Sequence, residues 1–249
     1  MRLDRILANI GLGSRKDVRA LIRRGAVQVD GQPLRQVDAQ IAEADLDKLS
    51  LNGKRLDTRM DLYLILDKPA DYLTAMEDTR FPCVADLLPE SYLARGVFPV
   101  GRLDRDSTGL LLFTNDGQLG HRLCSPEWKQ PKLYQFEHSG PAFREAEIQR
   151  VAQGLQEADF VCRPAKLTNL GDRDAQLVIC EGQFHQVKRM VAALGRELRS
   201  LRRLEFGPLT LAGLNGPASW RDLSDAETDA IYTSVGLEAP TLRQARGKA

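Results

Sequence analysis

Charged and hydroxyl side chains that could do chemistry are concentrated in residues 102–108. An unbroken apolar run follows at residues 110–113, which is typical of a buried strand, and a turn signal comes after it at residues 115–117. A carboxylate at the junction of a polar loop and a buried strand can be held rigidly at the edge of a cleft. Asp104 is therefore the candidate catalytic carboxylate, although a loop carboxylate taken alone is more often solvated.

The charge of the chain is small but unevenly distributed. The 249 residues are 43% hydrophobic, which is enough for a proper core and for two domains, and the formal net charge is +1. Residues 1–35 carry eight Arg or Lys against three Asp. A second basic cluster consists of Lys188, Arg189, Arg196, Arg199, Arg202 and Arg203. Two basic clusters in a nearly neutral chain indicate a polyanionic partner, with solvated helix faces as the alternative.

Several classes of protein are disfavoured by the composition. The four cysteines, Cys83, Cys124, Cys162 and Cys180, lack the paired spacing of a zinc site or a redox pair, so we expect buried thiols and no metal site. No apolar run approaches the length of a membrane span. Charged residues stand near the N-terminus, where a signal peptide would have its apolar core, so we expect a cytoplasmic protein.

Two helices and a hairpin are predicted at the N-terminus. Apolar spacing predicts a helix over residues 2–10. A second helix should begin at a capping box formed by Ser14 and Asp17 and should end before Gly25. A hairpin turn follows at residues 30–31.

This order resembles the S4-type RNA-binding domain over residues 1–52. The resemblance rests on the sequences Arg2-Leu3-Asp4, Ser14-Arg15-Lys16 and Val27-Gln28-Val29-Asp30-Gly31. It implies that a cationic helix beside a hairpin holds an RNA phosphate backbone. The RNA contacts are then expected from Arg2, Arg15, Lys16, Arg19 and Arg23. A helical dimerisation module is the alternative, and it would expose an apolar face instead of an arginine-rich one.

A polar stretch at residues 52–61 separates this domain from a second core. We place the RNA-binding domain at residues 1–58, a catalytic domain at 59–237 and a basic, flexible tail at 238–249. Within the second domain, strands are predicted at residues 62–66, 110–113, 132–134, 165–168, 174–179, 198–207 and 209–211. Helices are predicted at residues 117–123, at 143–151 and after a capping box of Ser224 and Glu227.

The central sequence resembles the signature of the pseudouridine synthases that act on ribosomal RNA, specifically the RsuA family. Residues Gly101-Arg102-Leu103-Asp104 and Thr108-Gly109-Leu110 match this signature. Two further elements match, Lys132-Leu133-Tyr134 and Gly182 followed by His185-Gln186-Val187-Lys188-Arg189-Met190. The chain departs from the pattern at Asp67 and Asp71, where Asn and Gly are usual, and at Gln183, where a basic residue is more common. Lys68-Pro69 matches and counts as support only.

The resemblance implies an α+β catalytic domain with a largely antiparallel or mixed sheet flanked by helices. It assigns catalysis to Asp104, stacking on the target base to Tyr134, a charge-stabilising cation to Lys188, site support to Arg102 and RNA contact to Arg189. His185, taken alone, is more often a hydrogen-bonding residue at a helix start than a catalyst, so we give it no acid–base role. The implied reaction converts a uridine of ribosomal RNA to pseudouridine, by covalent attack or by elimination, and needs no cofactor or metal. The implied partner is 16S ribosomal RNA in an assembly intermediate of the small subunit, bound by a monomer.

The sequence is compatible with three alternative functions. A large-subunit ribosomal RNA synthase of the same family would share every motif. A non-catalytic ribosome-assembly factor would keep both basic clusters and would not need Asp104. A glycoside hydrolase could use Asp104 and Asp106 as paired carboxylates, but sugar sites need aromatic platforms and this chain is only 6% aromatic.

Overall fold

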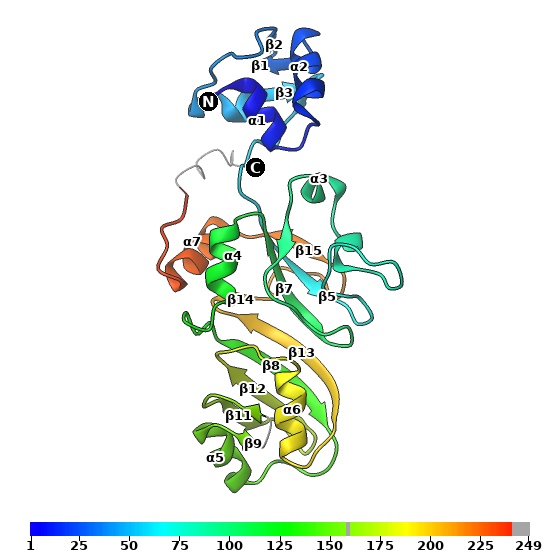
Figure 1. Ribbon diagram of the computed structural model, residues 1–249, viewed down its shortest axis with the longest axis vertical. Helices are drawn as coiled ribbons and strands as arrows, with labels where there is room; N and C mark the ends of the chain where they lie inside the picture. The colour runs from blue at the N-terminus through cyan, green and yellow to red at the C-terminus, as the bar shows by residue number, and fades with distance from the viewer. Residues whose placement is uncertain (158–159, 241–249) are drawn as a thin grey trace. The chain divides into compact units, whose positions relative to one another are not determined.

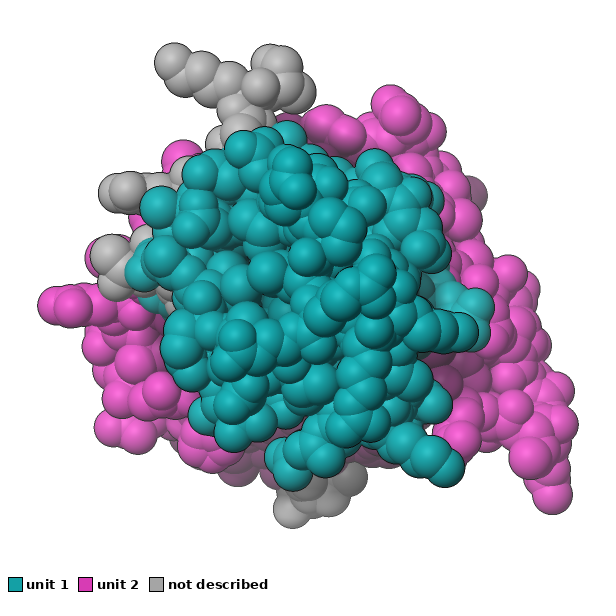
Figure 2. Space-filling model, turned by 90° about the horizontal axis from the view of Figure 1, so that it is seen from above, with its two compact units in different colours: residues 1–62, 89–97, 240–249 teal, residues 63–88, 98–239 magenta. Residues whose placement is uncertain are grey.

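The computed structural model describes residues 1–157 and 160–240. Most of the predicted basic tail, residues 241–249, lies outside this described part. In the part that is described, no helix is both long and apolar enough to cross a membrane. The chain divides into two compact units, which Figure 2 shows in different colours. Residues 1–62 group with residues 89–97 in the first unit, and residues 63–88 and 98–239 form the second.

The first unit consists of short helices and a small antiparallel sheet. Its strands pair in the order β2-β1-β3-β4. The capping box predicted at Ser14 and Asp17 is present at the start of α2, and the hairpin predicted at residues 30–31 joins β1 to β2. Apolar side chains from both helices and from β1 and β3 form its core. Its elements are α1 (Leu3–Asn9), α2 (Arg15–Arg23), β1 (Val27–Val29), β2 (Gln32–Pro33), a 3-10 helix (Glu43–Lys48), β3 (Leu49–Leu51), β4 (Lys54–Arg55) and α3 (Glu90–Leu93).

The second unit is built on one nine-stranded sheet (Figure 1). Its strands run in the order β11-β12-β8-β13-β7-β5-β15, with β14 paired to β13 and β6 paired to β7. The pairing of β7 with β13 is parallel and the other pairings are antiparallel, so the predicted largely antiparallel or mixed sheet is confirmed. The strands of this sheet are β5 (Tyr63–Lys68), β6 (Phe98–Pro99), β7 (Thr108–Thr114), β8 (Lys132–His138), β11 (Lys166–Asn169), β12 (Asp174–Ile179), β13 (Leu198–Phe206), β14 (Leu209–Thr210) and β15 (Trp220–Asp222).

Helices cover two separate parts of this sheet. In Figure 1, α4 and α7 lie beside the β5–β7 part, whereas α6 lies beside β8 and β13. Each part has its own apolar cluster, one of them around Leu110 and Leu112 and the other around Phe136 and Leu177. The remaining elements of this unit are α4 (Gly117–Cys124), α5 (Glu145–Gln153), α6 (Gln186–Ala193), α7 (Asp225–Ser234), a 3-10 helix (Val84–Leu87) and the hairpin of β9 (Gln156–Glu157) and β10 (Phe160–Val161).

The two parts of the sheet meet where β7 runs beside β13, and Gly109 permits this contact. Gly109 has φ +101°, and a Cβ added there would lie 2.2 Å from the carbonyl oxygen of Arg203. Only glycine accepts both the backbone angle and the close approach. Arg203 is itself 2% exposed, and its Nε donates to the carbonyl of Leu110 at 2.7 Å. We call this contact between β7 and β13 at Gly109 and Arg203 the seam. It fixes the loop before β7 against β13.

The prediction of a second exposed basic cluster is wrong for two of its members. Arg203 lies in the seam, and the side chain of Arg196 is 8% exposed and donates to both carboxylate oxygens of Glu147 at 2.8 and 3.0 Å. A buried arginine is tolerated where carboxylates and carbonyls satisfy its donors. The expectation of four buried thiols is also only partly right, because Cys83 and Cys162 are buried, Cys180 is half-buried and Cys124 is exposed.

Candidate active site

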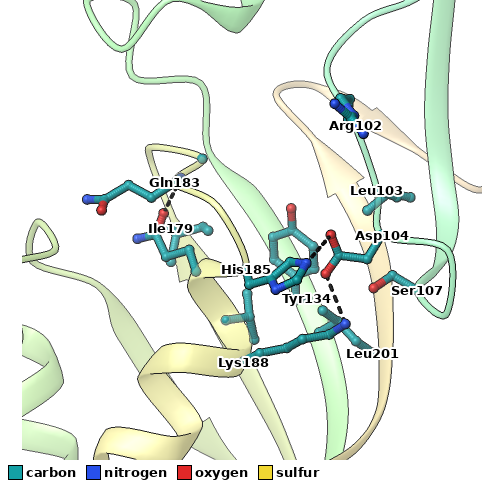
Figure 3. A pocket seen from close by; sticks show the side chains of 13 residues that line it. Arg102, Leu103, Asp104, Ser107, Tyr134, Ile179, Gln183, His185, Lys188 and Leu201 are labelled. Carbon is teal, nitrogen blue, oxygen red and sulfur yellow. Dashed lines mark hydrogen bonds and ion pairs between the residues drawn. The ribbon is translucent and has the colours of Figure 1, made fainter. Parts of the chain in front are cut away.

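Asp104 lies at the edge of a pocket formed by segments that are far apart in the sequence (Figure 3). It stands on the loop that connects β6 to β7. The pocket is otherwise lined from β8, from the end of β12, from β13 and from the segment that leads into α6. The side chains discussed below are those of Arg102, Asp104, Ser107, Tyr134, Gln183, His185, Gln186 and Lys188. All of them belong to the second unit.

The structure brings Lys188 to Asp104, as the sequence predicts. Lys188 lies in the first turn of α6, and its Nζ is 3.1 Å from Oδ2 of Asp104. The same ammonium donates to both oxygens of Asp106, at 2.8 and 2.9 Å. The side chains of Asp104 and Lys188 are 29% and 28% exposed, so this ion pair is only partly screened by water.

The charges in this cluster stabilise one another. Burial disfavours the charged form of Lys188, but hydrogen bonds to Asp106 and Asp104 outweigh this cost and raise the pKa of Lys188. Burial would likewise raise the pKa of Asp106, yet the hydrogen bond and positive charge of Lys188 lower it below its usual range. At neutral pH the lysine is therefore a fixed cation beside Asp104.

His185 starts α6, as expected, but its side chain does not cap the helix. The ring instead faces Asp104, with Nε2 3.5 Å from Oδ1 (Figure 3). The residue adopts φ 50° and ψ 34°, a left-handed conformation that is uncommon for residues other than glycine. Asp104 is thus approached by a histidine and by a lysine from the same segment.

Thr74, which the sequence analysis missed, clamps the backbone directly before Asp104. Its Oγ1 donates to the carbonyl of Leu103 at 2.7 Å and accepts from the backbone N–H of Leu103 at 3.2 Å. Thr74 is 9% exposed, so these bonds are shielded from competing water. A side chain from the loop after β5 therefore sets the position of the Asp104 backbone.

Lys68 supports the other end of the same loop and does more than the sequence indicated. It is fully buried, and its ammonium donates to the carbonyls of Pro69, Arg105 and Ser107 at 3.0, 3.1 and 2.8 Å. Burial lowers the pKa of Lys68 to about 8, against the attraction of Asp106, Asp104 and Asp71. The loop that carries Asp104 is therefore folded around a lysine that is still mainly protonated at neutral pH.

The two departures near Lys68 are accommodated locally. Asp71 adopts φ 68°, the left-handed angle that glycine favours, so the turn keeps the conformation that a glycine would give it. Its carboxylate accepts from Arg105 at 3.2 Å. Asp67 is 2% exposed, and its Oδ2 accepts from Arg202 at 2.7 Å. Each added negative charge therefore has an arginine partner.

Tyr134 and Arg102 occupy different positions in the pocket. Tyr134, on β8, is 7% exposed, and its ring lies behind the side chains of Asp104 and His185 in Figure 3. Arg102 also lines the pocket, but Figure 3 shows its side chain apart from Asp104. Ser107 is buried at the end of the loop. The pocket thus has one aromatic wall beside a carboxylate and its cations.

The predicted RNA-contacting residues are mostly exposed. Arg15, Lys16 and Arg23 are exposed on α2, and so is Arg19, whose Nε is 3.8 Å from Asp4. Arg2 is engaged with the same carboxylate at 2.9 and 3.1 Å. In the second unit, the guanidinium of Arg189 stacks on the ring of Phe160 at 4.2 Å.

The arrangement can hold a flat ring against Tyr134 and present a negative charge to an adjacent atom. A carboxylate placed in this way can act as a nucleophile or stabilise a developing positive charge. Over residues 1–157 and 160–240, no cluster of three or more His, Cys, Asp or Glu side chains could hold a metal ion.

Comparison with known proteins identifies both units. Residues 62–193 match the family model described as RNA pseudouridylate synthase, and residues 1–46 match the model described as S4 domain. The uncharacterized RNA pseudouridine synthase YtzG of Bacillus subtilis is 40% identical, with 91% of this chain and 96% of that protein covered. A ribosomal small subunit pseudouridine synthase A from Pseudomonas aeruginosa is 36% identical, with 93% and 100% covered.

Other similarities point to the same family. A ribosomal large subunit pseudouridine synthase B from Bacillus subtilis is 31% identical, with 86% of this chain and 88% of that protein covered. A solved structure described as a pseudouridylate synthase is 31% identical, covers 93% of this chain and 99% of its own, and aligns with a TM-score of 0.64. The predicted resemblance is confirmed. The chain belongs to the RNA pseudouridylate synthase family and carries an S4 domain at its N-terminus.

Proposed function

We propose that this protein isomerises one uridine of 16S ribosomal RNA to pseudouridine and that Asp104 is its catalytic residue. The observation that carries the proposal is the placement of Asp104 between Lys188 and His185, at the edge of a pocket with Tyr134 as its wall. The relative named as a small subunit synthase supports the choice of RNA, because the alignment covers 100% of it. The 31% identity to a large subunit synthase keeps the large-subunit RNA as the second candidate.

The proposed reaction exchanges one bond of the base for another. The bond between the uracil N1 and the anomeric carbon of the ribose breaks, the uracil turns in the pocket, and its C5 bonds to the same carbon. C5 loses its proton and the freed N1 takes one up, so the product is an isomer of the substrate. Asp104 either attacks the anomeric carbon or promotes the cleavage electrostatically, and both routes need an ionised carboxylate in a fixed position. Tyr134 would hold the flipped uracil by stacking.

Asp106 does not fit the glycosidase alternative. A glycosidase needs one carboxyl group with a raised pKa to act as a general acid. Lys188 lowers the pKa of Asp106 instead, and it binds Asp104 with the same ammonium. The two carboxylates therefore share one cation, and Asp106 is not suited to act as the general acid.

We assign RNA anchoring to α2 in the first unit. Arg15 and Lys16 occupy the first turn of this helix, where the helix dipole disfavours cations. Both are exposed, so neither is placed there to stabilise the helix. A phosphate backbone is the natural counterion for such a pair. Arg2, Arg19, Arg23 and Arg189 are proposed to extend these contacts.

The remaining parts of the proposal concern the setting in which the enzyme acts. We propose that it works as a cytoplasmic monomer, in keeping with an RNA substrate and with a pocket that lies within the second unit alone. We place its target in an assembly intermediate of the small subunit, where a uridine is still accessible for flipping out of the RNA.

Asp104→Asn should abolish turnover while leaving folding and RNA binding almost unchanged. The amide is nearly isosteric but is a poor nucleophile and carries no charge, so pseudouridine formation should fall roughly 10³-fold or more. Asp106→Asn is the matched control, because it removes the same charge beside the same lysine. Asp106 is 68% exposed, and exposed ion pairs contribute about 0–1 kcal/mol, so its loss should cost less than roughly fivefold. The measurement is pseudouridine formed per enzyme on 16S RNA, and wild-type-like turnover by Asp104→Asn would refute the assignment.

Thr74→Val should impair both stability and turnover. The change is nearly isosteric and leaves the buried N–H and C=O of Leu103 without their partner, which should cost about 1–3 kcal/mol of unfolding free energy. Because the backbone before Asp104 is then less firmly held, turnover should fall roughly 10- to 100-fold. Thr228→Val is the control, because Thr228 is 1% exposed and its hydroxyl donates to the Ser224 carbonyl within α7. It should lower stability and leave turnover unchanged, and equal losses of turnover in both variants would contradict the role of Thr74.

Replacing Arg15 and Lys16 together by Gln should flatten the salt dependence of RNA binding. If each cation neutralises one phosphate of single-stranded RNA, the slope of log affinity against log salt should fall by about 1.4. Lys166→Gln, at an exposed lysine on β11, should change the slope little. The slopes are obtained from titrations of labelled 16S RNA fragments at several salt concentrations. An unchanged slope in the double variant would show that α2 is not the electrostatic anchor.

A further inference from the structure

Phe184 is an aromatic residue that the fold leaves in solvent beside the active site. Its side chain lies in the segment between β12 and α6 and is 78% exposed. Its two chain neighbours, Gln183 and His185, both line the pocket that contains Asp104. Exposing a whole phenyl ring forgoes the stabilisation that burial would give it. Packing of the described core therefore does not explain this residue.

The ring of Phe184 is stacked on the ring of His185. The two ring centroids are 3.8 Å apart, and the ring planes are inclined by 22°. One face of Phe184 is therefore covered, and a ring that is still 78% exposed must present its other face to solvent. The covered face packs on His185, and Nε2 of His185 is 3.5 Å from Oδ1 of Asp104. The open face is thus the outer end of a short stack that begins beside the catalytic carboxylate.

The backbone around Phe184 is fixed before any ligand binds. His185 holds the left-handed conformation, and such strain persists only where surrounding contacts impose it. Gln183 supplies two of these contacts, since its side chain donates to the Val161 carbonyl at 2.7 Å and its backbone N–H donates to Gln186 at 3.0 Å. The side chain of Gln186 donates in turn to Glu181 at 2.6 Å. Phe184 is therefore carried by a preorganised turn.

We propose that the open face of Phe184 stacks on an unpaired nucleobase next to the uridine that enters the pocket. This inference rests on the proposed function, since it assumes an RNA substrate with a flipped uridine. Flipping a base removes the stacking partner of its neighbour, and an aromatic ring at the mouth of the pocket replaces that partner. Stacking of this kind tolerates any base, because every base has a π face.

The charge around Phe184 favours a nucleic acid over an apolar protein surface. Lys188 and Arg189 stand in the first turn of α6, directly after the Phe184–His185 pair. A base stacked on Phe184 would bring its own phosphates near these cations. An apolar protein surface would instead cover both cations without adding a negative charge beside them.

The test compares two RNA probes that differ only in their bases. A fluorescein-labelled oligouridylate of 12 nucleotides carries bases and phosphates, and an abasic ribose-phosphate 12-mer carries the same phosphates alone. Phe184→Ala should weaken binding of the oligouridylate roughly 5- to 150-fold and leave binding of the abasic 12-mer unchanged. Phe184→Trp should restore the affinity for the oligouridylate. Melting temperatures should stay the same, because Phe184 contributes little to the core.

Two control variants separate stacking from general effects. Leu170→Ala removes another exposed apolar side chain, 51% exposed and located at the turn between β11 and β12, and should affect neither probe. The Arg15→Gln, Lys16→Gln double variant should weaken both probes alike. Phe184→Ala is also measured in the background of this double variant. Binding through α2 is then weaker, so the measured affinity depends more on the second unit.

The outcomes distinguish this inference from the proposed function. The inference would be overturned if Phe184→Ala bound the oligouridylate as tightly as the wild type. It would also be overturned if Phe184→Ala lost the same affinity for both probes. Phe184 would then be assigned to a protein contact instead. Pseudouridine formation by the wild type would survive that result. A wild-type protein that forms no pseudouridine, while Phe184→Ala still loses affinity for the oligouridylate alone, would refute the proposed function and keep the stacking site.

Discussion

The candidate active site requires that the Asp104 carboxylate be held in one position, beside positive charge, at the edge of its pocket. Two lysines meet this requirement from different directions. Lys188 binds Asp104 from α6 at 3.1 Å, whereas Lys68 lies beneath the loop and binds its carbonyls. The proposed chemistry needs the negative charge of this carboxylate in a fixed position, and both lysines act on that position. The fold of the second unit can be understood as the means of bringing both lysines to one loop.

The parallel contact of β7 with β13 is what brings these segments together. β7 carries the Asp104 loop, and β13 follows α6 and its Lys188 directly in the sequence. Gly109 allows the two strands to approach so closely that any side chain there would clash with Arg203. The central sequence motif therefore reflects a packing requirement as well as the proposed chemistry. Its aspartate contributes the charge, and its glycine contributes the position.

The sequence predicted the features that depend on local patterns. The capping box at Ser14, the helix at residues 117–123 and the buried run of β7 follow from neighbouring residues, and all three are present. The pairing of Asp104 with Lys188 came from a family resemblance, and no spacing rule links residues so far apart. The relatives confirm that family over most of the chain, whereas the chemical roles of the two residues remain proposals.

The features that were missed depend on long-range partners. Thr74 has no sequence signal, because its function arises only when its loop returns to Leu103. Arg196 and Arg203 were assigned to a basic cluster that binds a polyanion or is solvated. They are buried because Glu147 and the Leu110 carbonyl accept their hydrogen bonds. Lys68 is hidden for the same reason. In each case a polar residue is buried by a partner that the sequence does not place beside it.

Pseudouridine mapping in cells tests most directly the proposal that Asp104 is needed to convert one uridine of 16S RNA. Ribosomal RNA would be mapped from cells that lack the gene and from the same cells carrying either the wild-type gene or Asp104→Asn. We predict that one 16S uridine stays unmodified without the gene, that the wild type restores its conversion, and that Asp104→Asn does not. An unchanged pseudouridine map after deletion, or restoration by Asp104→Asn, would contradict the claim.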